Sequence, residues 1–332
     1  MSTLKSKFVL FILFTTSVIA GCNYKLDIPL EYPTPPPTVQ STPVPALTLR
    51  TDRELAKQFA DIASEIEGEV GAAAVVIETG EAAFLNGDER FPMQSVYKLP
   101  IAMAVLEQVN RGRLDLDEKI GVAKDDMVRK GMRSPLRDGN PEGGEFTIRE
   151  LIRLAMVESD GTASDVLMRV AGDAGEVQSF ITRTGIFEMK VEDLEKEIGR
   201  DWQTQYRNYA TPAAAVELLR WLRVSADAEQ PDSREPIETP WGLLLQFMAD
   251  SNPGAARLKG LLPKGTVVAH KTGTSGTQNR ITAATNDIGI ITLANGKHAA
   301  VAVFVSDSTA DEKAREAIIA RIAHATWDRF SK

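Results

Sequence analysis

Apolar residues recur at helical spacing between residues 99 and 109, and this is the clearest periodic stretch of the chain. The residues that would share the buried face are Leu99, Ile101, Ala102, Val105, Leu106 and Val109. Ser95 stands in or just before the first turn of this predicted helix, and Lys98 lies one turn further on. A buried lysine is unfavourable unless it has a partner or a chemical task. The pair is therefore either a helix cap followed by a lysine whose ammonium reaches solvent, or a nucleophile beside its base.

Strand-like apolar runs lie near both ends of the globular part of the sequence. They cover residues 71–80, 81–88, 265–274 and 281–308, and the last contains a turn signal at Asn295-Gly296. A final helix is predicted for residues 311–330. Strands at both ends with helices between them predict an α/β part of about residues 47–90 and 265–332, with an inserted helical part of about residues 91–264.

Polar residues at characteristic positions predict where several helices begin. Capping boxes are predicted for Thr51 with Glu54 and for Thr147 with Glu150. Two further helices are predicted to begin with an N-cap threonine followed by proline, at Thr211-Pro212 and Thr239-Pro240. The first of these helices would bury Leu55, Phe59, Ile62 and Ile66.

The N-terminus is typical of an export signal. Lys5 and Lys7 precede the apolar run "FVLFILFTTSVIA", which is short for a membrane span, and the run leads into "IAGC". This ending resembles the bacterial lipobox, so we expect a signal peptide at residues 1–21, lipidation of Cys22 and a proline-rich tether at residues 22–46. The mature protein would be an exported, membrane-anchored lipoprotein facing the periplasm or the cell surface. An ordinary signal peptide followed by a chance cysteine is the alternative.

Composition excludes several classes of protein. The net charge is −8 and no basic block follows the signal, which argues against nucleic acid as a partner. The globular part has no cysteine, so it has no disulfide. His270, His298 and His324 lack the spacing of metal ligands, and no G-x-S-x-G motif is present. We therefore expect neither a metal nor a cofactor. We also expect the protein to be a monomer.

Three further short motifs follow Ser95 in the sequence. They are "ESDG" with Ser159 and Asp160 at the end of a predicted helix, "DLEKEIGRDWQTQYRNY" with Glu195, and "HKTGTSG" with Lys271, Thr272 and Gly273 on a predicted strand. Each is weak alone. By chance an S-x-x-K is expected about once in a chain of this length, and a K-T-G in about one chain in ten. In this order, and on these predicted elements, they are a strong signal.

The set S-x-x-K, S-D-x and K-T-G resembles the signature of serine β-lactamases and penicillin-binding proteins. The interval from Ser159 to Glu195 is similar to that of class A β-lactamases, and "DWQTQYRNYATP" and "KTGTSGTQNRITAATNDIGII" most resemble their extended-spectrum subgroup. The resemblance implies a five-stranded antiparallel sheet flanked by helices, with the site in the cleft against the helical part. It also implies a small-molecule β-lactam as the substrate.

The resemblance implies a role for each catalytic residue. Ser95, at a helix N-terminus, would be the acylated nucleophile, and Lys98 would be its base. Ser159 would relay a proton to the departing lactam nitrogen, and Lys271 would supply positive potential. Glu195 would polarise the water that hydrolyses the acyl-enzyme.

The resemblance also implies how the substrate is held. The backbone N–H groups of Ser95 and Thr274 would form the oxyanion hole, and Thr272, Gly273, Thr274 and Arg280 would bind the substrate. Arg280 could instead be a solvated charge on a strand with no role in binding. Glu195 could instead be a surface carboxylate with no catalytic role, because Glu192 and Glu197 lie close to it in the sequence.

Several positions depart from the family's pattern. Gly161 replaces the asparagine of S-D-N, and Gly199 replaces an asparagine that helps to hold the hydrolytic water. Near Met132 and Arg133 the aromatic residue of the cleft entrance is missing. Gln94 stands where the disulfide-bearing carbapenemases have cysteine, which argues against that subgroup.

Two other functions remain open from the sequence. A penicillin-binding D,D-peptidase-like protein with slow deacylation would keep the nucleophile, and a cell-envelope binding protein would keep only the fold. Glu195 favours the hydrolase over the peptidase. The retained polar residues of the three motifs argue against the binding protein.

Overall fold

The computed structural model describes residues 44–229 and 239–332. The predicted signal peptide at residues 1–21, the lipidation site Cys22 and most of the tether at residues 22–46 lie outside these ranges. Within the described ranges, no helix combines the length and the apolar character that crossing a membrane requires.

The centre of the fold is an antiparallel sheet whose five long strands come from both ends of the chain. Their order across the sheet is β3 (Glu81–Leu85), β2 (Glu69–Val76), β12 (His298–Ser308), β11 (Ile281–Thr292) and β9 (Val268–Thr274). This confirms the predicted five-stranded antiparallel arrangement. Two strands of two residues each extend it to seven: β1 (Arg50–Thr51) pairs in parallel with β3, and β10 (Thr277–Gln278) pairs with β11.

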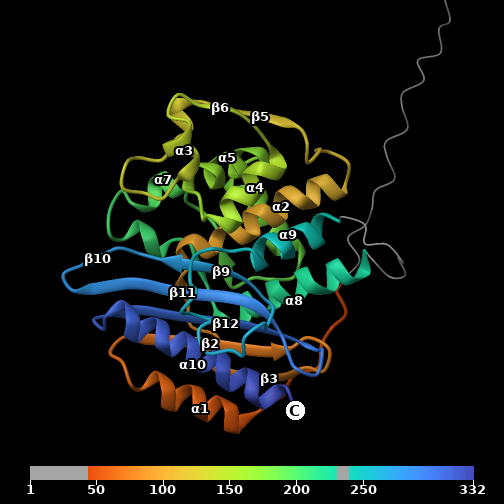
Figure 1. Cartoon of the computed structure of the whole chain (residues 1–332), viewed down its shortest axis with the longest axis vertical. Helices are drawn as coiled ribbons and strands as arrows, with labels where there is room; N and C mark the ends of the chain where they lie inside the picture. Colours follow the sequence, from red (N-terminus) through yellow and green to blue (C-terminus); the bar gives the residue numbers. More distant parts are fainter. Residues whose placement is uncertain (1–43, 230–238) are drawn as a thin grey trace, which may run out of the picture. The chain divides into compact units, whose positions relative to one another are not determined.

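Helices cover both faces of the sheet (Figure 1). On one face, α1 (Arg53–Ala63) and α10 (Glu312–Phe330) pack against the sheet and each other. On the other face, α8 (Pro212–Ala228) packs on β2 and β12. The residues of α8 lie in the predicted helical part of about residues 91–264, but this helix packs against the sheet. The strands contribute mainly small buried residues to the core on this side, among them Ala73, Ala300 and Ala302.

The helical part lies above the sheet in Figure 1 and also contains short strands. Its helices are α2 (Lys98–Asn110), α3 (Pro135–Gly139), α4 (Ile148–Val157), α5 (Gly161–Ala171), α6 (Ala174–Arg183), α7 (Glu195–Ile198) and α9 (Pro240–Ala249). Its 3-10 turns are η1 (Gln94–Tyr97), η2 (Lys124–Asp126) and η3 (Thr204–Tyr206). Its strands are β4 (Phe91–Pro92), β5 (Lys119–Val122), β6 (Gly144–Thr147), β7 (Met189–Lys190) and β8 (Tyr209–Ala210). The inserted part is therefore mostly, but not purely, helical.

Most of the predicted helix starts are confirmed. Thr147 and Glu150 form a reciprocal capping box at α4, and the threonines before Pro212 and Pro240 cap α8 and α9. The capping box at Thr51 is wrong. The Asp52 carboxylate caps α1 by accepting the N–H groups of Glu54 and Leu55, because Thr51 is already engaged in β1.

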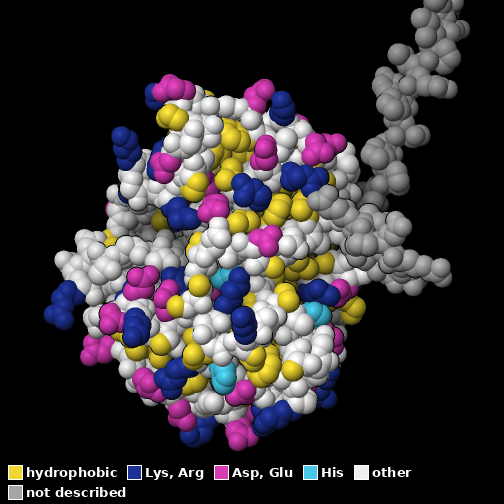
Figure 2. Space-filling model, viewed as in Figure 1, with side chains coloured by type: hydrophobic (Ala, Val, Ile, Leu, Met, Phe, Trp, Pro, Cys, Tyr) yellow, Lys and Arg dark blue, Asp and Glu magenta, His cyan; other side chains and the backbone are white. Residues whose placement is uncertain are grey.

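Charged side chains of both signs are interspersed over the face shown in Figure 2, and neither sign forms a continuous block there.

Candidate active site

Ser95 lies at the junction of a strand, a 3-10 turn and a helix. The chain leaves β4, turns through η1 and continues without a break into α2, so Ser95 precedes the first turn of α2. Its hydroxyl makes no capping hydrogen bond. The residue before it, Gln94, has a φ of 49°, a left-handed conformation that non-glycine residues seldom adopt. The Ser95 Oγ instead accepts a hydrogen bond from Lys98 Nζ at 2.7 Å.

Lys98 is the centre of the polar cluster. Its side chain is 1% exposed, and its ammonium has three acceptors: Ser95 Oγ at 2.7 Å, Glu195 Oε2 at 2.7 Å and the Ser159 carbonyl at 3.3 Å. The three N–H donors of a lysine are thus all used. The side chain does not reach solvent, so the interpretation of Ser95 and Lys98 as a cap and a solvated lysine is wrong.

Ser159 and Lys271 meet beside Lys98, which donates to the Ser159 carbonyl. Ser159 follows α4 with a φ of 57°, and the carboxylate of the next residue, Asp160, caps α5. Lys271, on β9, donates to Ser159 Oγ at 2.8 Å. Burial and the nearby Lys98 ammonium hold the pKa of Lys271 well below its ordinary value.

Glu195 is the first residue of α7, and its carboxylate is oriented by two donors. Its Oε2 accepts from Lys98 Nζ at 2.7 Å and from the Tyr97 hydroxyl at 2.6 Å. Burial by itself would raise the pKa of Glu195, but the Lys98 ammonium and the Tyr97 hydroxyl outweigh it and leave the pKa lowered. The carboxylate is therefore ionised near neutral pH and can accept a proton.

The two neighbouring glutamates do not enter this cluster. Glu192 pairs with Lys190 and Arg207, and Glu197 accepts from its own helix start at Leu194 N and from Arg200. Of the three glutamates on this segment, Glu195 is the one that contacts Lys98, so the alternative of a surface carboxylate is wrong for Glu195.

Asp165 and Tyr97 support Glu195 and were not identified from the sequence. Asp165, on α5, accepts the backbone N–H of Glu195 at 2.6 Å and that of Lys196 at 3.1 Å. Burial raises the pKa of this carboxyl to about 7. Burial and the Glu195 charge raise the pKa of the Tyr97 hydroxyl well above its ordinary value. Both contacts join residues far apart in the chain, and no local pattern marks them.

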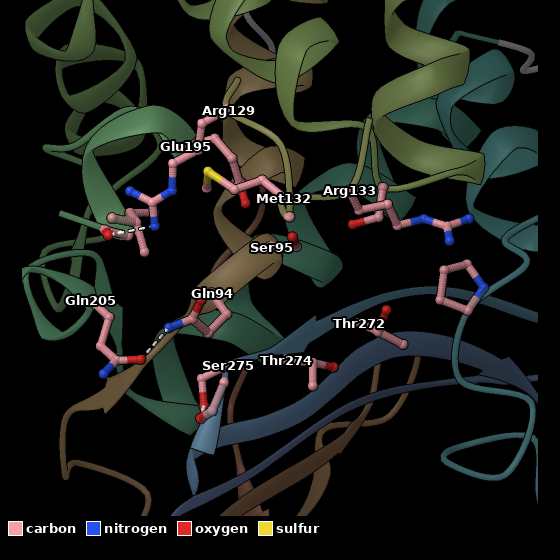
Figure 3. Close-up of a pocket in the computed structure, with 16 residues that line it drawn as sticks. Gln94, Ser95, Arg129, Met132, Arg133, Glu195, Gln205, Thr272, Thr274 and Ser275 are labelled. Atoms are coloured by element: carbon pink, nitrogen blue, oxygen red, sulfur yellow. Dashed lines mark hydrogen bonds between the residues drawn. The ribbon is translucent and has the colours of Figure 1, made fainter. Parts of the chain in front are cut away.

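Ser95, Ser159 and Glu195 line a cleft of about 460 Å³. In Figure 3, Ser95 lies between Met132 and Arg133 on one side and Thr272 and Thr274 of β9 on the other. At the far end, the side-chain amides of Gln94 and Gln205 are hydrogen-bonded at 3.1 Å. The cleft thus offers a hydroxyl nucleophile, a lysine bridged to a carboxylate, and a strand edge with hydroxyl donors.

A family model described as Beta-lactamase enzyme family matches residues 54–330. The chain belongs to this family. The beta-lactamase VEB-1 of Pseudomonas aeruginosa is 37% identical over 261 residues, which cover 79% of this chain and 85% of the relative. The extended-spectrum beta-lactamase PER-1 of the same organism is 37% identical over 275 residues, which cover 82% of this chain and 86% of the relative.

Solved structures give the same result. The TLA-3 extended-spectrum beta-lactamase is 39% identical with a TM-score of 0.78, covering 84% of this chain and 99% of that one. A class A beta-lactamase from Bacteroides cellulosilyticus DSM 14838 is 28% identical with a TM-score of 0.75, covering 85% of this chain and 99% of that one. The protein is a serine β-lactamase of class A.

In this β-lactamase, the structure does not bring Arg280 into the cleft. Arg280 is exposed, has a φ of 68° and lies in the tight turn between β10 and β11. The guanidinium beside β9 is that of Arg257, which is 4% exposed and donates to Thr274 Oγ1 at 2.8 Å. Arg257 also bonds the Gly273 carbonyl at 3.2 Å and Glu316 Oε1 at 3.0 Å. Substrate binding by Arg280 therefore stays a prediction, and the arginine that contacts Thr274 in the structure is Arg257.

Gly273 has a packing role in the β-lactamase. A Cβ at this position would lie 2.3 Å from the Met93 carbonyl oxygen, so only glycine lets β9 approach the turn that carries Ser95.

Gly161, the departure from S-D-N, leaves room for Glu195. A Cβ there would lie 2.7 Å from Glu195 Cγ. Gly161 offers Lys98 no side-chain acceptor, and the Ser159 carbonyl is the third acceptor of that ammonium.

In the part of the β-lactamase that the structure describes, no group of His, Cys, Asp and Glu side chains is arranged to hold a metal ion.

Proposed function

We propose that this β-lactamase opens penicillins and cephalosporins through an acyl-enzyme on Ser95, which water then hydrolyses with help from Glu195. The observation that supports this is the position of Lys98 Nζ, 2.7 Å from both Ser95 Oγ and Glu195 Oε2. The Lys98 ammonium thus connects the Ser95 hydroxyl to the Glu195 carboxylate, which can accept a proton during acylation.

In the acylation step, the Ser95 oxygen attacks the lactam carbonyl carbon and the C–N bond breaks. Lys98 passes a proton to the Glu195 carboxylate and takes the proton of Ser95. Ser159 donates its hydroxyl proton to the departing nitrogen and regains one from Lys271 Nζ, 2.8 Å away. The proton on Glu195 then returns through Lys98 to the pair of Ser159 and Lys271, so that Glu195 is ionised again and the proton of Ser95 has in effect moved to the nitrogen. Backbone N–H groups of Ser95 and Thr274 would stabilise the oxyanion, and Thr272 and Thr274 would bind the substrate's carboxylate in the field of Lys271.

In the deacylation step, a water attacks the ester carbonyl and the Ser95 oxygen leaves. Glu195 Oε2 is occupied by Lys98 and Tyr97, and among the described residues no donor is hydrogen-bonded to Oε1. The Oε1 atom is therefore the one available to take the proton of the water. Lys98 donates a proton to the leaving Ser95 oxygen and regains one from Glu195, which restores the starting state.

Hydrolysis of a chromogenic cephalosporin by the purified protein tests the proposal. We expect many turnovers per enzyme, with the absorbance change far exceeding the enzyme concentration. A single stoichiometric burst with no further product would instead favour the penicillin-binding protein with slow deacylation. No reaction and no covalent adduct would contradict both.

We also propose that the mature protein is an exported monomer, anchored in the membrane by lipid on Cys22. The support is "IAGC" after an apolar run, followed by a proline-rich segment. In a bacterial host the native protein should fractionate with membranes, whereas Cys22→Ser should release it or block its processing. One acyl chain holds a protein only marginally, but lipobox processing adds several, so retention should survive washing with salt. Native protein recovered as free periplasmic material, cleaved elsewhere than before Cys22, would contradict the anchor.

A further inference from the structure

Arg129 lies in the wall of the cleft, in the segment between η2 and α3. It lines the same cavity as Ser95 and Glu195, and Figure 3 shows it on the side of the Glu195 segment, across from β9. The proposed mechanism gives this side chain no task.

The guanidinium of Arg129 is held by one backbone contact. Its Nη2 donates to the Gly199 carbonyl at 2.5 Å. A guanidinium carries five N–H donors, so most of them remain for a ligand. Across residues 44–229 and 239–332, no carboxylate forms an ion pair with Arg129.

Gly199 makes this position possible. A Cβ on Gly199 would lie 2.2 Å from Arg129 Nη2 and 3.0 Å from its Cζ. The guanidinium thus occupies the space into which a side chain at residue 199 would extend. Where an asparagine would present a neutral amide to the cleft, this chain presents a positive charge.

The other charges of the cleft are compensated by neighbours. Glu195 pairs with Lys98 at 2.7 Å, and Arg133 pairs with Glu158 at 3.1 Å. Lys271 is the cation that the mechanism assigns to the carboxylate on the ring system of the substrate. Arg129 therefore adds a second, separate positive charge on the opposite wall.

We propose that Arg129 forms an anion-binding subsite for the acyl side chain of the substrate. The class it would favour is β-lactams whose side chain carries a carboxylate in addition to the one on the ring system. The inference rests on the proposed reaction at Ser95, because that reaction places the side chain in this cleft. A guanidinium binds a carboxylate with two parallel hydrogen bonds, which gives direction as well as charge attraction.

The test compares benzylpenicillin with its analogue bearing a carboxylate on the benzylic carbon. The readout is the second-order rate of adduct formation on Ser95 by intact-protein mass spectrometry, expressed as the ratio of the two substrates. We expect Arg129→Ala to lower the ratio of dicarboxylate to monocarboxylate about five- to tenfold, and Arg129→Glu to lower it further. Arg129→Lys should keep part of the preference, and high salt should reduce the wild-type ratio.

Lys130→Ala is the matched control, because Lys130 is the exposed neighbour of Arg129 and does not line the cleft. It should leave the ratio unchanged. The proposal is overturned if Arg129→Ala leaves the ratio at the wild-type value, or if Lys130→Ala changes it as much. Since the readout is adduct formation, an enzyme that acylates but does not deacylate would contradict the proposed hydrolysis and still give a result for the subsite.

Discussion

Ser95→Ala is expected to abolish covalent labelling by a fluorescent penicillin and to lower turnover by about 10⁴-fold or more. The substitution removes the only atom that can form the ester, and nucleophile and base act as a unit. Stability should change little, because Lys98 keeps Glu195 and the Ser159 carbonyl as partners. Gel fluorescence after labelling and a thermal melt of the same sample measure both quantities.

Ser225→Ala, on α8 and away from the cleft, controls for the loss of a serine hydroxyl. It should label like the wild type. Lys98→Ala should also reduce labelling by several orders of magnitude, but it removes the ammonium that pairs with Glu195. Removing one partner of a buried ion pair typically costs about 3–5 kcal/mol, so this variant should also melt earlier. Stoichiometric labelling of Ser95→Ala would contradict the assignment of the nucleophile.

The parts of the fold that depend on local signals could be predicted from the sequence. Helix starts at Thr147, Thr211 and Thr239 need only a capping side chain and a few suitable residues directly after it, and the structure has all three. The exception, Thr51, shows the limit of such signals. Two adjacent polar residues could cap the helix, and the pairing of β1 with β3 decides that it is Asp52.

Site residues that lie in a sequence motif could be predicted. Residues that reach the site only through a tertiary contact could not. Ser95, Lys98, Ser159 and Lys271 lie in the motifs, and the structure brings their side chains together. Tyr97 also lies beside Lys98 in the sequence, but its role depends on its hydroxyl meeting Glu195, which lies 98 residues further along the chain.

The arginines show the same limit. A cation at a suitable distance after K-T-G suggested Arg280, but the turn at Asn279 and Arg280 directs that side chain to solvent. Arg257 reaches Thr274 from a segment without any periodic pattern. Arg129 fills space that exists only because residue 199 is glycine. None of these contacts can be read from spacing.

Glu195→Gln is expected to acylate but to stall, so that a Ser95 adduct accumulates. Glutamine has nearly the same shape and keeps an oxygen that can accept from Lys98 and Tyr97, but it cannot take a proton. Acylation should therefore slow, because Lys98 must lose its proton to solvent before it can act as the base. Deacylation should slow more, because no carboxylate then takes the proton of the water. General-base help is typically worth about 10²–10⁴-fold, and deacylation should slow by that amount. Intact-protein mass spectrometry after mixing with a penicillin should show the added mass of the substrate persisting for minutes or longer.

Two matched variants separate this effect from a general loss of charge on the same segment. Glu192→Gln and Glu197→Gln each remove one carboxylate that the structure pairs with surface cations and not with Lys98. Both should turn over at nearly the wild-type rate and show no lasting adduct. If Glu195→Gln hydrolysed as fast as the wild type, the water would have another base. If the wild type itself stayed acylated for hours, Glu195 would not act in deacylation, and the protein would function as a penicillin-binding receptor with a β-lactamase fold.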